Sequence, residues 1–316
     1  MGDITSARIF CTCDAGNYDV ECKCLHENVT VSENRERTIE MQINDRMEQI
    51  NNAVAQHFTE VYADKDSGTD CEREIVREHF LDVYVNERLT FRLTCTASDL
   101  VELVLGRLFT EGWIQGTVDV ESLTLCESGK VARVFLREEL QEKDSQEASG
   151  REATCCTGNR TFLEHNGKKT LAVLPQVNWE NGWIFALAEE FAKDSGLHRQ
   201  TGGTHSCYLG MAGKCICHRE DIGRHNALDK CIGYALRKNL NLSEVILFTT
   251  GRVPADMAQK VIAAGIPVLA SKAVPTDQAV ELAEKYHLNL ICRAWPDRME
   301  IYHDARENVR ECSKRI

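Results

Sequence analysis

The chain has 316 residues, of which 49 are acidic and 37 are basic, so its formal net charge is −12 at pH 7. Phosphate backbones are bound by basic faces, and the Lys and Arg residues here are dispersed, which argues against a general nucleic-acid-binding protein. No apolar run is long enough to cross a bilayer, and the first residues lack the charged-then-apolar plan of a signal peptide. We therefore expect a cytoplasmic protein that acts without nucleic acid or membrane.

The cysteine content is high, at 15 residues. Without an export signal, this number indicates reduced thiols, metal ligands or sulfur chemistry rather than a disulfide framework. Two Cys-x-Cys pairs, Cys11 with Cys13 and Cys22 with Cys24, lie near the N-terminus. They leave a small metal site and a sulfur relay open as alternatives.

The length predicts two domains, or one large domain with an extension. Residues 1–70 read as an extension that holds the Cys-x-Cys pairs and a polar helix from about Thr38 to Tyr62. Residues 71–150 are expected to form a smaller α+β subdomain. Residues 151–316 are expected to form an α/β domain that carries the functional site.

The N-terminal subdomain contains a predicted hairpin and a predicted helix. HFLDVYVNERLTFRLT alternates apolar and polar residues about a turn at Asn86 and Glu87. Ser98 or Asp99 is expected to cap the next helix, which Gly112 ends. The charged stretch 137–151 is predicted to be a loop or linker.

Cys155 and Cys156 are adjacent in the polar segment ATCCTGNRTF. A loop thiol whose pKa is lowered by Arg151 or Arg160 is a nucleophile and can carry a persulfide. A vicinal pair can also oxidise, bind a metal, or be incidental in a cysteine-rich chain. The pair is therefore a candidate catalytic site, and the rest of the sequence has to decide between these roles.

The densest group of polar residues lies between Gln200 and Lys230, in the motifs TGGTHS and EDIGRHNALDK. The two glycines favour close backbone approach to a ligand, and His205 beside them is either a proton donor and acceptor or a turn histidine. A helix is predicted from Ile222 to Asn239. Its apolar face is opposite four polar residues, His225, Asn226, Asp229 and Lys230. His225 and Asp229 are one turn apart, so we expect the carboxylate to orient the imidazole, unless this is a solvated face.

The segment MAGKCICHRED is predicted to be a strand after a turn at Gly213, with Cys215, Cys217 and His218 as metal ligands being the alternative. The chain has no Pro-Cys-x-x-Cys motif, which argues against zinc deaminase chemistry.

The C-terminal segment reads as strand-helix-strand-helix-strand, with strands at VILFTT, IPVLAS and LNLICRA. Pro254 is placed at a helix start and Gly265 at its end. Ligands of such sheets bind beyond the carboxyl ends of the strands. The residues expected there are Gly251, Arg252, Ser271, Lys272 and Arg293. Their three cations suit phosphates, with solvated surface charges as the alternative.

With these motifs, the chain resembles the formate dehydrogenase accessory sulfurtransferase family (FdhD/NarQ) from about Arg77 to Tyr302. The matching blocks are VYVNERLTFRLTCTASDLVELVLGRLFTEGWI, TGGTHS, EDIGRHNALDK, TTGRV and AGIPVLASKAVPT. The resemblance implies an α/β, cytidine-deaminase-like layered fold without deaminase activity, and a homodimer. It also implies transfer of sulfur from a cysteine desulfurase to the molybdenum (or tungsten) bis-pterin guanine dinucleotide cofactor, which then enters formate dehydrogenase.

The resemblance also assigns residues. It places the persulfide on Cys155, with Cys156 as a neighbouring rival and Gly158 where the family has a second cysteine. It places the pterin dinucleotide on the segment Arg293, Ala294, Trp295, Pro296, Asp297 and Arg298, where Trp295 is expected to stack on a ring. The further cofactor-binding residues expected are Thr201, Gly202, Gly203, His205, Glu220, Asp221, His225, Asn226, Lys230, Gly251, Arg252, Ser271 and Lys272. The alternative is a cofactor-binding chaperone through which no sulfur passes.

Overall fold

The computed structural model describes residues 41–63, 67–137, 145–147, 159–161, 163–165, 171–193 and 196–306. The chain divides into a unit of residues 1–38 and a unit of residues 39–316, and all described residues belong to the second. None of the helices described is long and apolar enough to span a membrane. The domain boundaries expected from the sequence, at residues 70 and 150, stay a prediction.

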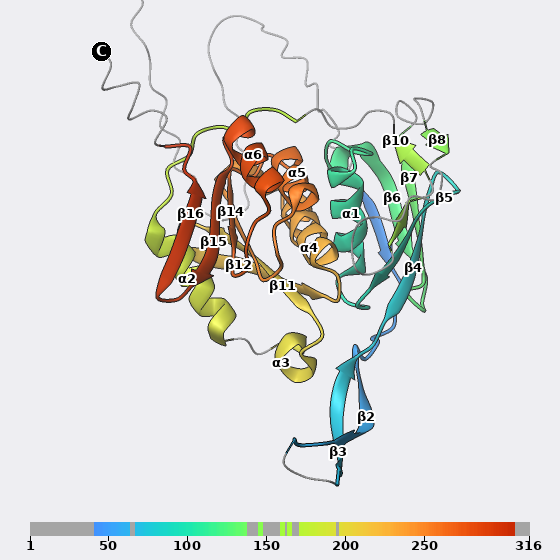
Figure 1. The fold of residues 1–316 in the computed structure, drawn as a ribbon. Coiled ribbons are helices and arrows are strands. Elements are labelled where there is room, and N and C mark those ends of the chain that lie inside the picture. Colours follow the sequence, from blue (N-terminus) through green and yellow to red (C-terminus); the bar gives the residue numbers. More distant parts are fainter. Residues whose placement is uncertain are drawn as a thin grey trace, which may run out of the picture. The chain divides into compact units, whose positions relative to one another are not determined.

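The first sheet has six strands in the order β1-β6-β7-β4-β5-β9 (Figure 1). Their bounds are β1 Gln42–Asp45, β4 His79–Val85, β5 Arg88–Cys95, β6 Val120–Leu125, β7 Val131–Leu136 and β9 Arg160–Thr161. The predicted β4–β5 hairpin is confirmed. Asn86 and Glu87 have φ angles of 47° and 63°, as a two-residue turn of the right twist requires.

Helix α1 (Leu100–Thr110) covers this sheet and is buried along its whole length. Gly112, with a φ of 81°, follows its end as predicted. The predicted side-chain cap is wrong. Asp99 stands at the N-cap position in the left-handed region and makes no capping hydrogen bond with its side chain. A short 3₁₀ helix, η1 (Thr117–Asp119), leads from α1 to β6.

The predicted helix from Thr38 to Tyr62 is wrong. Residues 42–45 are β1, and β2 (Ala53–Glu60) pairs antiparallel with β3 (Thr69–Val76) in a separate two-stranded ribbon. Val54, Phe58 and Thr59 favour a pleated strand, and pairing with β3 satisfies their backbone groups. The linker predicted over 137–151 also contains a short strand, β8 (Ser145–Glu147), which pairs with β10 (Leu163–His165).

The second sheet has the order β12-β11-β13-β14-β15-β16. Its strands are β11 His205–Met211, β12 Lys214–Asp221, β13 Ile246–Thr249, β14 Val268–Ser271, β15 Asn289–Trp295 and β16 Arg298–His303. Strands β13, β14 and β15 are parallel, which confirms the predicted alternation of strands and helices. Strand β12 after the Gly213 turn is also confirmed, whereas β16 was not foreseen.

Helices cover both faces of this sheet (Figure 1). On one face are α4 (Arg224–Arg237), α5 (Ala255–Ala263) and α6 (Asp277–Tyr286), and on the other is α2 (Asn181–Lys193). The short α3 (Leu197–Thr201) precedes β11, and the 3₁₀ helix η3 (Leu242–Glu244) precedes β13. The chain is thus an α/β protein, and its cytidine-deaminase-like layering stays a prediction.

The two sheets are joined through α1 and α4, which cross with their backbones in contact. A Cβ atom on Gly106 would lie 1.8 Å from the carbonyl oxygen of Asp229, and one on Gly233 would lie 1.9 Å from that of Glu102. The two glycines therefore let each helix lie directly on the other. This crossing brings the end of β5 beside the start of α4, where the polar motif EDIGRHNALDK lies.

Candidate functional site

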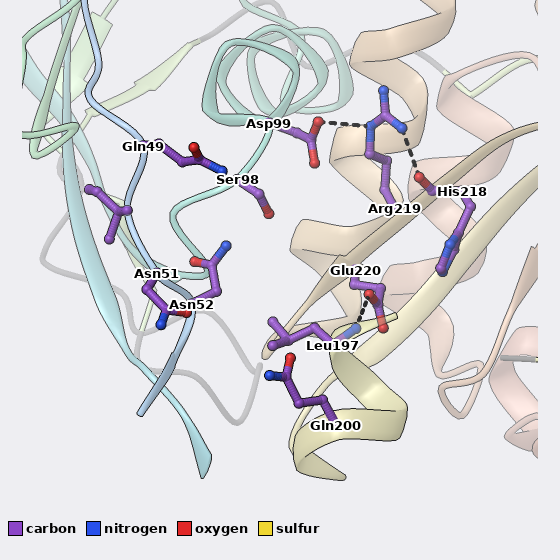
Figure 2. Close-up of a pocket in the computed structure, with 11 residues that line it drawn as sticks. Gln49, Asn51, Asn52, Ser98, Asp99, Leu197, Gln200, His218, Arg219 and Glu220 are labelled. Atoms are coloured by element: carbon purple, nitrogen blue, oxygen red, sulfur yellow. Dashed lines mark hydrogen bonds and ion pairs between the residues drawn. The ribbon is translucent and has the colours of Figure 1, made fainter. Parts of the chain in front are cut away.

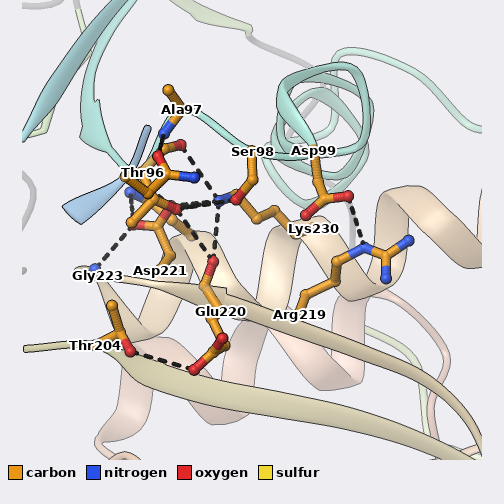
Figure 3. Close-up of polar contacts among 12 residues, drawn as sticks. Thr96, Ala97, Ser98, Asp99, Thr204, Arg219, Glu220, Asp221, Gly223 and Lys230 are labelled. Atoms are coloured by element: carbon orange, nitrogen blue, oxygen red, sulfur yellow. Dashed lines mark hydrogen bonds and ion pairs between the residues drawn. The ribbon is translucent and has the colours of Figure 1, made fainter. Parts of the chain in front are cut away.

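The motif EDIGRHNALDK folds into a buried ion pair that links the two sheets (Figure 3). Lys230 Nζ lies 2.7 Å from Asp221 Oδ2, and both side chains are fully buried. The ammonium also donates to Thr96 Oγ1 at 2.7 Å and to the Glu220 carbonyl at 3.0 Å. The carboxylate accepts from the backbone N–H groups of Thr96 and Gly223. Every partner is internal, as a buried charge requires.

Asn226 extends this group toward the cysteine-containing segment. Its amide donates to Asp221 Oδ1 and to the Thr94 carbonyl, both at 2.9 Å. Its Oδ1 accepts from Asn159 Nδ2 at 2.8 Å, and Asn159 Oδ1 accepts from the Thr94 N–H at 2.8 Å. We call Thr96, Asn159, Asp221, Asn226 and Lys230 the central polar cluster.

Asn159 was not singled out from the sequence, although it stands three residues after Cys156 in the same polar segment. It is fully buried. The predicted catalytic residues Cys155 and Cys156 lie outside the described residues. Asn159, in the same segment of the sequence, contacts Asn226 of the motif that sequence analysis had treated separately.

Replacing Asn159 by Ala is expected to lower the free energy of unfolding by about 1–3 kcal/mol. The change leaves the buried Thr94 N–H and Asn226 Oδ1 without partners, which costs their desolvation. Chemical denaturation measures the loss, and Arg160→Ala, at an exposed neighbouring position, is the control. An unchanged midpoint in Asn159→Ala would contradict the anchoring role.

The expected pairing of His225 with Asp229 is wrong. His225 Nε2 lies 3.0 Å from Asp256 Oδ2, at the start of α5. Asp229 is fully buried and accepts instead from Lys260 at 2.9 Å and from Thr110 at 2.9 Å. Position 229 faces α1 and α5 because the α1–α4 crossing turns that side of the helix inward. These four polar residues of α4 are thus buried, and the alternative of a solvated face is also wrong.

Glu111 lies beside the buried pair of Asp229 and Lys260, and its Oε1 is 3.4 Å from Lys260 Nζ. Burial would raise its pKa, but the charges of Arg107 and Lys260 outweigh burial and lower the pKa from 4.5 to about 2. Because the folded pKa lies below the unfolded one, the stabilisation is present above pH 4.5 and is lost as the pH falls toward 2. A third of the side chain is exposed, so solvent screening limits the contribution to about 1–2 kcal/mol.

We therefore expect Glu111→Gln to be less stable than the unmodified chain at pH 6 and to approach it as the pH falls from 4.5 to 2. Urea unfolding at several pH values measures the difference. A difference that stays constant over this range would show that the charge of Glu111 contributes nothing.

Glu220 and the TGGTHS segment hold α3 against β12. The Glu220 carboxylate accepts from the backbone N–H groups of Leu197 and His198, each at 2.7 Å. Thr201 Oγ1 donates to the Leu197 carbonyl, and Gly202, with a φ of 67°, ends α3. Gly203 is exposed and lies against Val76, so a Cβ there would be 2.7 Å from that side chain. This segment therefore has a structural task beside the ligand binding expected of it.

A cavity of about 530 Å³ lies beside the contact between Glu220 and the start of α3 (Figure 2). It is lined by polar side chains of the segment before β2, the start of α1, α3 and β12, among them Gln49, Asn52, Gln200 and Glu220. Asn52 Oδ1 accepts from the Ala97 N–H at 2.7 Å. The cavity is thus a polar cleft in whose wall Asn52, Gln200 and Glu220 already make hydrogen bonds.

His205, Arg224 and Gly251 meet at the carboxyl edge of β13. Gly251 leaves room for the Arg224 side chain, whose Cβ would be 2.9 Å from a Cβ at position 251. Arg224 Nε is buried and has no hydrogen-bond partner among the described residues. Burial, together with the nearby charge of Arg224, lowers the pKa of His205, which favours the neutral imidazole. Sequence analysis counted Arg224 in the polar motif but assigned it no role.

The cations expected at this edge differ in their surroundings. Lys272 Nζ lies 4.6 Å from the centre of the Phe191 ring and 5.0 Å from that of Trp295, so this ammonium contacts both rings. Arg252 is exposed, and Ser271 is buried with its hydroxyl on the Gly251 carbonyl. Trp295 therefore already contacts a cation, beside the ring stacking expected of it.

The segment Arg293–Arg298 is a β-hairpin rather than a loop beyond a strand. Arg293 lies inside β15 and pairs with Glu300 at 3.6 Å, because β16 extends the sheet. Ala294 is buried, whereas Pro296, Asp297 and Arg298 are exposed at the turn and the start of β16. The prediction that Arg293 follows the last strand is thus corrected, and its cofactor-binding role stays a prediction.

The described cysteines differ in the direction in which their surroundings shift the thiol pKa. Burial raises the pKa of Cys95, Cys231 and Cys292, the last to about 12. Cys126 differs: burial would raise its pKa, but contacts with the Ser128 hydroxyl and the Val131 N–H lower it. Among the described residues, no group of three His, Cys, Asp or Glu side chains is placed to hold a metal.

Comparison with known proteins shows which family this chain resembles. Residues 76–309 match the model of the FdhD/NarQ family. The Sulfur carrier protein FdhD of Halalkalibacterium halodurans is 33% identical over 234 residues, which are 73% of this chain and 87% of that protein. The protein of the same name from Listeria monocytogenes is 29% identical over 238 residues, 74% of this chain and 90% of the other.

A crystal structure from Desulfotalea psychrophila, described as a formate dehydrogenase accessory protein, has the same fold. The TM-score is 0.65 with 21% identity, over 80% of this chain and 97% of the other. The family match covers the hairpin, α1, the central polar cluster and the whole second sheet. The chain therefore belongs to the FdhD/NarQ family.

Proposed function

We propose that this chain is a sulfur carrier for the maturation of formate dehydrogenase. A cysteine desulfurase passes sulfur to Cys155 or Cys156 as a persulfide, and the persulfide passes it to the molybdenum or tungsten bis-pterin guanine dinucleotide, which is bound as a substrate. The relatives named sulfur carrier proteins support the carrier role, and the accessory-protein structure supports the link to formate dehydrogenase. A cytidine-deaminase-like scaffold and a homodimer belong to the same proposal.

The observation that carries the proposal is the anchoring of the cysteine segment by Asn159 on Asn226. An extended chain spans at most about 3.5 Å per residue, so the Cα of Cys155 lies within about 14 Å of that of Asn159. Asn226 is in the first turn of α4, next to Arg224 and His225. We propose that the thiols act beside the carboxyl edge of the second sheet.

The carboxyl edge offers charges that fit a pyrophosphate. Arg224, Arg252, Lys272 and Arg298 have no carboxylate partner among the described residues, whereas Arg219, Lys230, Arg237, Lys260 and Arg293 each have one. Helices α4 and α5 both begin at this edge, so their N-terminal N–H groups add to the positive potential. These groups would hold the phosphates of the cofactor, while neutral His205 can accept or donate a hydrogen bond.

The thiolate is the reactive form of the carrier cysteine. It attacks the terminal sulfur of the desulfurase persulfide, which releases the desulfurase thiolate and leaves the persulfide on this chain. The unpaired cations at the edge also favour a thiolate tethered near them.

The test is mass spectrometry of peptides after incubation with an active cysteine desulfurase and cysteine. We expect one added sulfur, removable by a reductant, on the peptide that contains Cys155 and Cys156. The peptide with Cys126 is the internal comparison, because that thiol has a lowered pKa. Sulfur on Cys126 alone, or on neither peptide, would contradict the proposal.

The alternative is a chaperone that binds the cofactor but passes no sulfur, and Gly158 in place of a second family cysteine favours it. A Cys155→Ala, Cys156→Ala variant separates the two in a strain that lacks the native gene. A carrier loses formate dehydrogenase maturation almost completely in this variant, whereas a chaperone retains it. Circular dichroism confirms that the variant is folded.

A further inference from the structure

A second cavity lies at the opposite edge of the second sheet, where β13 and β14 begin. It has a volume of about 320 Å³ and is lined by Ile246 and Val268, the first residues of these strands, and by Trp179, Trp183 and Met211. Its size and mainly apolar wall are typical of small-molecule sites. The carboxyl edge is one strand length away, about 13 Å, so the two sites do not overlap.

The cavity is shaped by rigid elements. Trp183, in the first turn of α2, packs against the turn between β11 and β12. A Cβ on Gly213 of that turn would be 2.8 Å from the indole, and Gly213 has a φ of 77°. Glycine at this position thus serves both the turn and the placement of the ring. Trp179 is 3% exposed and is held from behind by Arg306, whose guanidinium lies 3.9 Å from the ring centre.

The charge of the wall is negative. Glu244 is the one ionisable side chain among the described residues that line the cavity. Its Oε1 accepts from Asn241 Nδ2 at 2.8 Å, and no partner is found for Oε2 in the described part of the chain. No Lys or Arg lines the cavity, so nothing in its described wall neutralises the carboxylate.

The partly exposed indole of Trp183 and the Glu244 carboxylate, beside an apolar space, are suited to an organic cation, whereas the buried ring of Trp179 already contacts the Arg306 guanidinium. The faces of Trp carry negative partial charge and attract ammonium and guanidinium groups more strongly than other aromatic rings do. An apolar body attached to the cation would replace water on Ile246 and Val268. A neutral ligand of the same shape would also displace this water, but it would not gain the attraction between the cation and the indole ring.

We propose that this cavity binds an organic cation, either a free quaternary ammonium compound or the basic side chain of a partner protein. The net charge of −12 also favours cationic ligands over anionic ones outside the carboxyl edge. This site is independent of the proposed sulfur transfer, and its test does not depend on it.

The test uses choline and its neutral isostere 3,3-dimethylbutan-1-ol as probes, with the indole N–H signals of the chain's four tryptophans in NMR as the readout. We expect choline to shift the Trp179 and Trp183 signals with a millimolar dissociation constant and to leave Trp113 and Trp295 unchanged. Glu244→Gln should weaken binding roughly tenfold, whereas Glu180→Gln, at an exposed carboxylate outside the cavity, should not change it.

An acetylated and amidated Gly-Arg-Gly peptide distinguishes the two sources. Tighter binding of the peptide than of choline, at the same indoles, indicates a partner side chain, and the reverse indicates a small molecule. Equal binding of 3,3-dimethylbutan-1-ol, or choline binding that Glu244→Gln does not change, would overturn the assignment. The signals of both variants also report whether they are folded.

Discussion

Lys230→Met is expected to lower the free energy of unfolding by about 3–5 kcal/mol. Methionine nearly matches the length of lysine but leaves the Asp221 carboxylate buried, with its closest cation removed. An uncompensated buried charge of this kind costs several kcal/mol. The Thr96 hydroxyl and the Glu220 carbonyl lose a donor at the same time. Denaturant unfolding followed by circular dichroism measures the change.

Two further variants make this result specific. Lys238→Met, at an exposed position just after the same helix, should change stability by less than about 0.5 kcal/mol. The double variant Asp221→Asn, Lys230→Met removes both charges and should recover part of the loss, because a neutral amide costs less to bury than a carboxylate. If the double variant is as unstable as the sum of its single changes, the ion pair is not what stabilises the cluster.

Gly233→Ala is expected to destabilise the chain by about 1–3 kcal/mol or more, although alanine is the better helix former. The new Cβ would lie 1.9 Å from the Glu102 carbonyl oxygen, and backbone atoms cannot give way as a flexible side chain can. The helices must then separate, and the cost of this overpacking outweighs the gain of about 1 kcal/mol in helix propensity.

Gly182→Ala is the matched control for this change. Gly182 is also helical, in α2, but nothing lies within 4 Å of a Cβ at that position. We expect this variant to be equally stable or slightly more stable than the unmodified chain. Equal effects of the two substitutions would show that the α1–α4 crossing adapts without cost.

The parts of the fold that the sequence predicted well are those with local signals. The β4–β5 hairpin carries its turn residues, Asn86 and Glu87, within the predicted segment. The alternation of β13, α5, β14, α6 and β15 is marked by Pro254 and Gly265. The strands β1 and β2 were mistaken for a helix. The partner of β1, β6, lies far along the chain, whereas β2 pairs with the neighbouring β3 and this local pairing was missed.

The candidate site was predicted as a set of residues but not as an arrangement. The spacing of His225 and Asp229 on a helix suggested a pair, whereas the crossing with α1 separates their environments. Asp221 and Lys230 are strongly polar, and a single sequence does not show that they are buried against each other. Arg224 was predicted only as a member of the polar motif, and Asn159 carries no local signal of its own. Their positions depend on Gly251 and Thr94, which are distant in sequence.

The central polar cluster also has a consequence for how the chain folds. The contact of Thr96 with Asp221 joins residues 125 positions apart, and that of Thr96 with Lys230 joins residues 134 positions apart. Contacts of such long range form late, because the entropy of closing the intervening chain must be overcome first. The ion pair is desolvated only when both sheets are in place. The two sheets should therefore unfold together in one cooperative transition, and refolding should be slow.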